Sequence, residues 1–347
     1  MTVEVRSRRP PIKQPGSPNE VQLRLVHDSE PGLHRDGSPG KFTYSDADGS
    51  RVCDEAVLGR IRRLAIPPAW ITVWIAPYPD AHLQATGFDR RGRKQYRYHE
   101  QWRTDRDHLK FLDMEGFARA QSLVRGKIEV ALRAGEGTLE HRRVLALSLR
   151  LLDIGLLRVG SDRYARDNQH YRLTTLRRDQ VTLRHDEAVF DYIGKAGKSH
   201  RTAISDPQAI DALRDLKRRR QGPDELLVYR GPRGWGRVHR EDVNNFLRAE
   251  SGGPYSAKEY RTWNATVIAA ATLAARRPGR SHAASVASTA VAQALGNTPA
   301  VAQRSYIDPR VLERFAAGRA IALTRLPTDP WQARKRVESR VLELLDS

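Results

Sequence analysis

The spacing of apolar and polar residues divides the chain into two parts. Between residues 21 and 99 the apolar residues stand in short runs separated by Pro, Gly and Asp, a pattern typical of β-strands joined by turns. One helix is predicted near 54–64, and the strand-like runs are VQLRLV, KFTYS, ITVWIAPYP, HLQATGFD and KQYRYH. From about residue 103 apolar residues recur at steps of three and four, which indicates amphipathic helices. A small β-rich domain followed by a mostly helical one is therefore expected.

The helical part is expected to contain an inserted sheet. Its first two helices are predicted over 105–133 and 139–157, after which strand-like runs return between residues 171 and 205. The runs YRLTTL, QVTLR, AVFDYIG and HRTAIS suggest a three-stranded sheet. A strand is predicted at 226–229, and further helices are predicted at 207–220, 257–275, 281–296, 299–304, 308–321 and 329–345.

These elements predict an α+β fold with two domains, 20–102 and 103–347. Residues 1–19 mix proline with charge and show no apolar periodicity, so a disordered basic tail is expected there. The single cysteine, Cys53, excludes an intramolecular disulfide framework and a cysteine-rich metal site, and it suits a reducing compartment. The sequence shows neither a leader peptide nor an apolar run long enough to span a membrane, so a cytoplasmic protein is expected.

The net charge indicates a polyanionic partner. With 60 Lys and Arg residues against 41 Asp and Glu residues, the chain carries a formal charge of +19 and has a pI near 10.5. Such an excess of positive charge is the electrostatic signature of nucleic-acid binding. Most of the excess lies beyond residue 100, so the larger domain is expected to make most of the phosphate contacts.

A turn at 89–92 leads into a basic and aromatic strand, RKQYRY, in which Tyr96 and Tyr98 share one face. Such a strand can place amide and phenol groups in a DNA groove while arginines hold phosphates. Packing of the two tyrosines on the sheet is an equally good interpretation of the pattern alone.

Tyr306 is a candidate nucleophile near the end of the chain. Gly296 ends an alanine-rich helix, and Thr298-Pro299 opens a new helix of barely two turns before Tyr306. This geometry can bring the phenol beside Asn297. A tyrosine at a helix end is more often a core residue, so the hypothesis depends on further motifs.

Three further motifs precede this tyrosine. Arg158 opens the string RVGSDRY after the helix at 139–157, the turn GKAGKS contains Lys195, and Lys258 and Arg261 share a helix face at a spacing of three. GKAGKS is not an ATP-binding P-loop, because Tyr192 stands where that loop needs a glycine and a strand follows instead of a helix. Taken singly, each basic residue could equally be a solvated charge or part of a structural salt bridge.

The order Arg158, Lys195, Arg261, Asn297, Tyr306 resembles the active site of poxvirus-type topoisomerases IB in their bacterial form, and it is similar to that of tyrosine recombinases. The resemblance implies that Tyr306 attacks a DNA phosphate and leaves a 3'-phosphotyrosyl link and a free 5'-hydroxyl. The two arginines would hold the non-bridging oxygens and Asn297 would donate an uncharged hydrogen bond. Lys195 would protonate the leaving 5'-oxygen.

Two positions depart from the family pattern. The family commonly has His where this chain has Asn297, and the poxvirus relative has an acid where it has Ala196. Asn297 cannot titrate, so the role assigned to it is oxyanion stabilisation and not proton transfer. The resemblance also implies DNA contacts from the basic strand, from the string after Arg158 and from the helix of Arg261, made by Gln95, Tyr96, Tyr98, Arg163, Tyr164 and Lys258.

The implied protein is a DNA topoisomerase of type IB, a monomeric clamp on double-stranded DNA that works at the nucleoid and needs no ATP, metal or other cofactor. Its larger domain would have the tyrosine recombinase/topoisomerase IB catalytic fold. A tyrosine site-specific recombinase is the nearest alternative, although such enzymes normally have a helical N-terminal domain and act as tetramers. A non-catalytic DNA-binding protein with a degenerate site is a further alternative, and the presence of all five positions argues against it.

Overall fold

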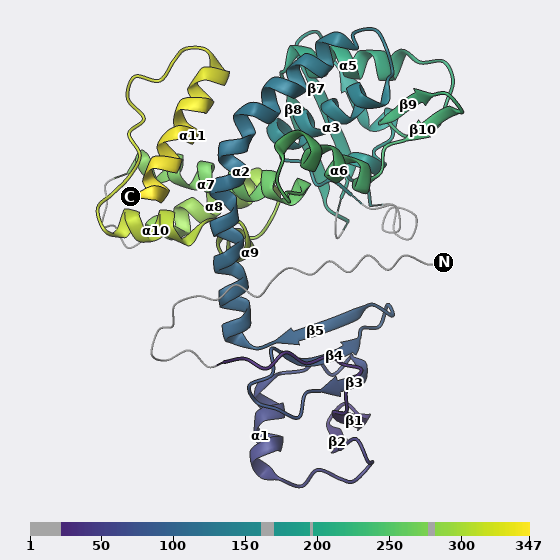
Figure 1. Cartoon of the computed structure of the whole chain (residues 1–347), viewed down its shortest axis with the longest axis vertical. Coiled ribbons are helices and arrows are strands. Elements are labelled where there is room, and N and C mark those ends of the chain that lie inside the picture. The colour runs from purple at the N-terminus through teal and green to yellow at the C-terminus, as the bar shows by residue number, and fades with distance from the viewer. Residues whose placement is uncertain (1–21, 161–169, 195–196, 277–281) are drawn as a thin grey trace. The chain divides into compact units, whose positions relative to one another are not determined.

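The computed structural model describes residues 22–160, 170–194, 197–276 and 282–347. The chain divides into two compact units, residues 1–109 and 110–347, and the division falls inside the long helix α2 (Glu100–Ala134) (Figure 1). The sequence-based boundary at 102–103 lies near the start of the same helix, because helical periodicity begins there. The tail expected at 1–19 lies outside the described residues.

The described part of the first unit contains an antiparallel sheet, one complete helix and the start of α2. The strands lie in the order β2-β1-β3-β4-β5, and the Asp54 side chain caps the helix by accepting hydrogen bonds from two backbone N–H groups. Ile61 of the helix is buried against apolar side chains of the sheet, among them Ile75. The elements are β1 (Leu33–Ser38), β2 (Lys41–Ser45), α1 (Glu55–Arg63), β3 (Ile71–Ile75), β4 (Leu83–Phe88) and β5 (Lys94–Tyr98).

Four of the five strand-like runs in this unit form strands, and the first run does not. In its described residues, VQLRLV makes one isolated β-bridge, between Arg24 and Ala81, and Leu25 is 70% exposed. The first strand is instead β1, LHRDGS, which pairs with both β2 and β3. Its polar composition hides it from a search for apolar alternation, and the glycines Gly37 and Gly40 at its turn have positive φ.

The second unit is mostly helical and is built around helix α3 (His141–Gly155). Leu147, Leu149 and Leu151 of α3 are fully buried, so neighbouring elements cover this helix on all sides. Among the described helices, α6 is the one missing from the sequence-based expectation, although its buried residues have helical spacing. The other described helices are α5 (Pro207–Arg218), α6 (Arg240–Ser251), α7 (Ala257–Ala274), α8 (Ala283–Leu295), α9 (Pro299–Ser305), α10 (Pro309–Ala316) and α11 (Pro330–Asp346).

The inserted sheet has three antiparallel strands, β6 (Val181–Leu183), β7 (Ala188–Ile193) and β8 (Ser199–Ile204), as expected. The run YRLTTL is not one of them and contains a 3-10 turn, η1 (Leu173–Thr175). Its N–H groups bond elsewhere: Leu173 donates to the carbonyl of Arg158 and Thr174 to that of Val159, both at 2.9 Å. These two N–H groups are therefore not available to pair with a neighbouring strand.

The basic loop RGPRGWGR is part of a second, two-stranded sheet. β9 (Val228–Gly231) pairs with β10 (Gly234–Arg237), and the guanidinium of Arg230 lies 5.3 Å from the ring centroid of Trp235. The tryptophan therefore packs within the hairpin. In the described ranges, no helix combines the length and the apolar character that crossing a membrane requires.

Candidate active site

Arg158 and Arg261 reach the same place from two helices. Helix α3 ends in Leu156, whose φ of 53° turns the chain out of the helix, and Arg158 follows two residues later. Arg261 lies in the first half of α7 and is only 5% exposed. Its Nη1 donates to the carbonyl of Leu156, and its Nη2 donates to the carbonyl of Leu295 at 2.9 Å. Arg261 thus joins the end of α3 to the end of α8.

Asn297 is held by Arg158. The Nη2 of Arg158 donates to Oδ1 of Asn297 at 2.6 Å and also approaches the carbonyl of Leu295 at 3.5 Å. Gly296, with a positive φ of 62°, ends α8 and makes the turn that brings Asn297 to this position. The Nδ2 of Asn297 is buried and has no hydrogen-bond partner among the described residues. The hydrogen bond from Arg158 fixes which end of the amide is the free donor.

Tyr306 completes the group at the C-terminal end of α9. Its backbone carbonyl accepts a hydrogen bond from the hydroxyl of Thr266 on α7 at 3.4 Å, so the tyrosine is tied to the helix that carries Arg261. The guanidinium carbon of Arg261 lies 5.4 Å from the centroid of the Tyr306 ring. The expected helix break at Gly296 and the short helix that begins at Pro299 are both present, and Thr298 caps that helix.

The site is strongly electropositive. Burial and the neighbouring charge of Arg158 lower the pKa of Arg261 to about 10, and Tyr306 acts in the opposite direction. A cavity of about 210 Å³ opens beside both arginines, and none of its described lining residues is an Asp or a Glu. Two guanidinium groups that carry no carboxylate partner in this cavity form a site for an anion such as a phosphate.

His200 and Tyr192 also line this cavity, and the sequence analysis does not identify them as site residues. They are cross-strand partners on β7 and β8, and their rings stack at 5.5 Å between centroids. Burial, followed by the charges of Arg158 and Arg261, lowers the pKa of His200, so its imidazole is neutral at pH 7. The sequence could have indicated them, because two strands joined by the GKAGKS turn place Tyr192 opposite His200.

Several of the proposed site residues cannot be placed. Lys195, Arg163 and Tyr164 lie outside the described residues, as does Ala196. Lys258, on α7, is exposed to solvent, whereas Arg261 three residues later is buried. The structure therefore brings together Arg158, Arg261, Asn297 and Tyr306 out of the five positions predicted to be catalytic.

The strand β5 presents its two tyrosines as the sequence predicts. Tyr96 and Tyr98 are exposed on one face, with ring centroids 6.0 Å apart and planes inclined by 11°. Gln95 lies on the opposite face, and its Nε2 donates to Oδ2 of Asp89 at 3.0 Å. The tyrosines are therefore accessible to a partner, while the amide donor of Gln95 is already engaged.

A second basic cavity lies within the first unit, next to Tyr98. It has a volume of about 400 Å³, and Trp102, Arg103 and Arg106 of α2 line it together with His82. His82 Nδ1 accepts a hydrogen bond from the backbone of Val26 at 3.2 Å, which leaves Nε2 as the nitrogen that carries the proton. The cavity offers several hydrogen-bond donors and aromatic faces, a combination suited to the sugar-phosphate backbone of a nucleic acid.

Two family models match the chain in succession. The model described as the N-terminal domain of bacterial DNA topoisomerase IB matches residues 41–89, and the model described as the catalytic core of eukaryotic DNA topoisomerase I matches residues 99–318. A protein of Acanthamoeba polyphaga mimivirus named DNA topoisomerase 1B is 29% identical over 302 residues, which cover 82% of this chain and 87% of the viral protein. With matches over both units, the chain belongs to the type IB DNA topoisomerases.

Proposed function

We propose that this topoisomerase cuts one strand of duplex DNA by attack of the Tyr306 phenol on a backbone phosphate. A bond forms between the phenolic oxygen and phosphorus, the bond from phosphorus to the 5'-oxygen breaks, and the phenolic proton passes to solvent. The products are a 3'-phosphotyrosyl link and a 5'-hydroxyl. Attack by the 5'-hydroxyl on the same phosphorus reverses the step and restores the strand.

The observation that carries the proposal is a pair of arginines, Arg158 and Arg261, beside a cavity whose described lining has no carboxylate. Asn297 is hydrogen-bonded to Arg158, and the ring of Tyr306 lies next to Arg261. Negative charge grows on the two non-bridging oxygens during attack, and the forked guanidinium groups can bind both. The free Nδ2 of Asn297 supplies a third donor with no charge of its own. A tyrosine with an ordinary pKa of about 10 must lose its proton during the reaction, and the surrounding cations favour that loss.

The leaving 5'-oxygen is strongly basic, so it needs a proton as the bond breaks. We assign this role to Lys195 because of its position in the motif order, on the turn between β7 and β8. The same hairpin carries Tyr192 and His200, which line the cavity. Because these two residues line the cavity, we expect Lys195 to reach the phosphate bound there.

The covalent intermediate keeps the energy of the broken phosphodiester bond, so religation needs no ATP. Protein cations perform the charge stabilisation that a metal would otherwise supply, and the proposed reaction includes no metal step. While the strand is open, the free 5'-end can rotate and relieve either sense of supercoiling. We propose a monomeric enzyme that works on the DNA of the nucleoid, with β5 and the basic cavity beside it as further contacts to the duplex.

The alternative of a site-specific recombinase has less support. Such enzymes normally have a helical N-terminal domain, whereas this chain has a sheet there that matches the bacterial topoisomerase IB N-terminal domain. Strand exchange between two duplexes would be the activity that favours it.

Replacement of Tyr306 by Phe tests the proposal. The variant loses one oxygen and little packing, so it should bind duplex DNA as the unaltered enzyme does and form no covalent adduct on a denaturing gel. A persisting adduct would assign the nucleophile to another tyrosine. Tyr260 is the matched control, because it lies beside Arg261 on α7 but its side chain is only 1% exposed, and Tyr260→Phe should keep the adduct.

A further inference from the structure

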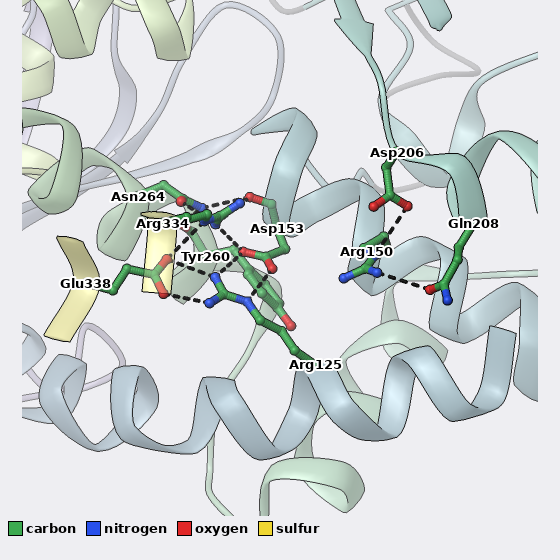
Figure 2. A network of polar contacts seen from close by, with 9 residues as sticks. All are labelled: Arg125, Arg150, Asp153, Asp206, Gln208, Tyr260, Asn264, Arg334 and Glu338. Atoms are coloured by element: carbon green, nitrogen blue, oxygen red, sulfur yellow. Dashed lines mark hydrogen bonds and ion pairs between the residues drawn. The ribbon is translucent and has the colours of Figure 1, made fainter. Parts of the chain in front are cut away.

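A buried ionic network lies behind the catalytic arginines. Its centre is Arg125 of α2, which is 5% exposed and lies between two carboxylates (Figure 2). Arg125 donates to both oxygens of Asp153 on α3, at 2.7 and 2.9 Å, and to both oxygens of Glu338 on α11, at 2.6 and 2.9 Å. One guanidinium group thus holds α3 and α11 together through two forked contacts.

Arg334, also on α11, joins the same network from the other side. Its Nε donates to Glu338 at 3.0 Å, and its Nη2 donates to Oδ1 of Asp153 at 2.5 Å. The same Nη2 reaches Oδ1 of Asn264 on α7 at 2.9 Å and the backbone carbonyl of Asp153 at 3.1 Å. That carbonyl also accepts a hydrogen bond from Nδ2 of Asn264 at 3.1 Å. Side chains from α7 and α11 therefore cap the last turn of α3.

The network lies next to both arginines of the active site in the sequence as well as in space. Asp153 is in the last turn of α3. Three residues later, the backbone carbonyl of Leu156 accepts a hydrogen bond from Arg261. Asn264 is one helical turn beyond Arg261 on α7. The direction in which α3 ends sets the position of Arg158, and the rotation of α7 sets that of Arg261.

The charges of the network are paired one to one. Arg125 and Arg334 face Asp153 and Glu338, so two positive charges meet two negative ones, and only the side chain of Arg334 is partly exposed. Removal of one partner leaves an uncompensated charge among groups that are hydrogen-bonded to each other. The network then has to rearrange, and the end of α3 is the part of it that leads into the active site.

We propose that α11 is a positioning element for catalysis, in which Arg334 and Glu338 fix the ends of α3 and α7 that carry Arg158 and Arg261. Helix α11 begins at Pro330, beyond the last residue matched by the catalytic-core family model, 318. This inference rests on the proposed role of the two arginines. If α11 positions the arginines, the geometry of the site depends on a helix outside residues 99–318, the range that the catalytic-core family model matches.

The test uses Arg334→Lys and Glu338→Gln, each close in size to the residue it replaces. Lysine keeps the charge but cannot bind Glu338, Asp153 and Asn264 with one rigid fork. The assay is single-turnover cleavage of a short duplex containing a site mapped with the unaltered enzyme, at saturating DNA. Mispositioned arginines lower the rate constant, whereas partial unfolding lowers the amplitude and leaves the rate constant of the remaining enzyme unchanged.

We expect the rate constant of both variants to fall by about 10- to 100-fold, since small displacements of catalytic groups have effects of that size. The affinity for duplex DNA should stay within about threefold of that of the unaltered enzyme, because the charged groups of the network are already paired with one another. Religation should slow by the same factor, because it passes through the same transition state. The cleavage–religation equilibrium should then stay where it is.

Asp346→Asn is the matched control. Asp346 also joins α11 to α2, through an ion pair with Arg119 at 2.6 Å, but this pair is solvent-exposed and lies outside the network. The control should lose neither rate nor amplitude. Arg261→Ala belongs in the same assay: if it cleaves at the normal rate, the proposed site itself is wrong. If Arg261→Ala is slow while both α11 variants keep their rate constant, or if Asp346→Asn slows as much as they do, only the role of α11 is wrong.

Discussion

Arg158 and Asn297 are separated by 139 positions in the chain and are joined by a hydrogen bond of 2.6 Å. The arginine donates and the amide oxygen accepts, which leaves the buried amide nitrogen of Asn297 as a donor without a partner among the described residues. Two of the five proposed catalytic positions therefore depend on each other for their orientation.

Replacement of Asn297 by Ala should lower the cleavage rate by about 100-fold, because it removes one donor to the developing oxyanion and one acceptor for Arg158. Asn297→His should retain most of the rate, since the imidazole can donate in the same place. Single-turnover cleavage measures both. Equal loss in the two variants would mean that the amide is needed for its fit to Arg158 and not as a donor.

Lys195→Ala should lose cleavage of ordinary DNA and recover it on a substrate with sulfur at the bridging 5'-position. A thiolate leaves without protonation, so this substrate bypasses a missing general acid. Arg261→Ala should not be rescued, because the modified bridge does nothing for charge on the non-bridging oxygens. Rescue of both variants, or of neither, would make Lys195 a positioning contact.

The unaltered enzyme should relax positively and negatively supercoiled plasmid in the presence of EDTA and without ATP. The cations that stabilise the transition state belong to the protein, and the covalent link stores the bond energy. Relaxation should weaken steeply as salt rises, because phosphate contacts release counterions. An absolute requirement for magnesium would contradict the mechanism.

His200 should make the folded state less stable at acid pH. Burial and the two arginines lower its pKa, so below about pH 6.5 the unfolded state binds a proton that the folded state resists. The free energy of unfolding therefore falls as the pH drops from 7 through this window. Thermal unfolding of His200→Gln should show a shallower dependence on pH between 7 and 5. His82, whose pKa is also lowered, remains in both proteins, so the difference in slope belongs to His200.

Much of the helical architecture follows from local patterns. The helix break at Gly296, the start at Pro299 and the three-stranded sheet agree with the apolar periodicity and the capping residues, and α3 ends at Gly155, two residues before the expected end at 157. The two errors in the strands of the first unit have tertiary causes. VQLRLV has the composition of a strand but only one bridge partner, whereas LHRDGS becomes a strand because β2 and β3 pair with it on both sides.

The candidate site was predictable as a set of residues and not as a geometry. The resemblance of the motifs to the topoisomerase IB pattern selects Arg158, Arg261, Asn297 and Tyr306 as candidates, but no local rule gives the hydrogen bond from Arg158 to Asn297. Likewise, YRLTTL looks like a strand until its N–H groups are seen to bind the carbonyls next to Arg158. Such contacts depend on the packing of distant helices, which periodicity does not encode.

The carbonyl of Leu295 is a shared acceptor for Arg261 and Arg158, at 2.9 and 3.5 Å. It is a peptide oxygen at the negative end of helix α8, and it carries no net charge. A carboxylate at this place would hold the same guanidinium groups more firmly, but it would repel an incoming phosphate and would have to be displaced by it. Because a neutral group anchors the arginines, DNA meets two positive charges that are already aligned and have no resident anion to exchange.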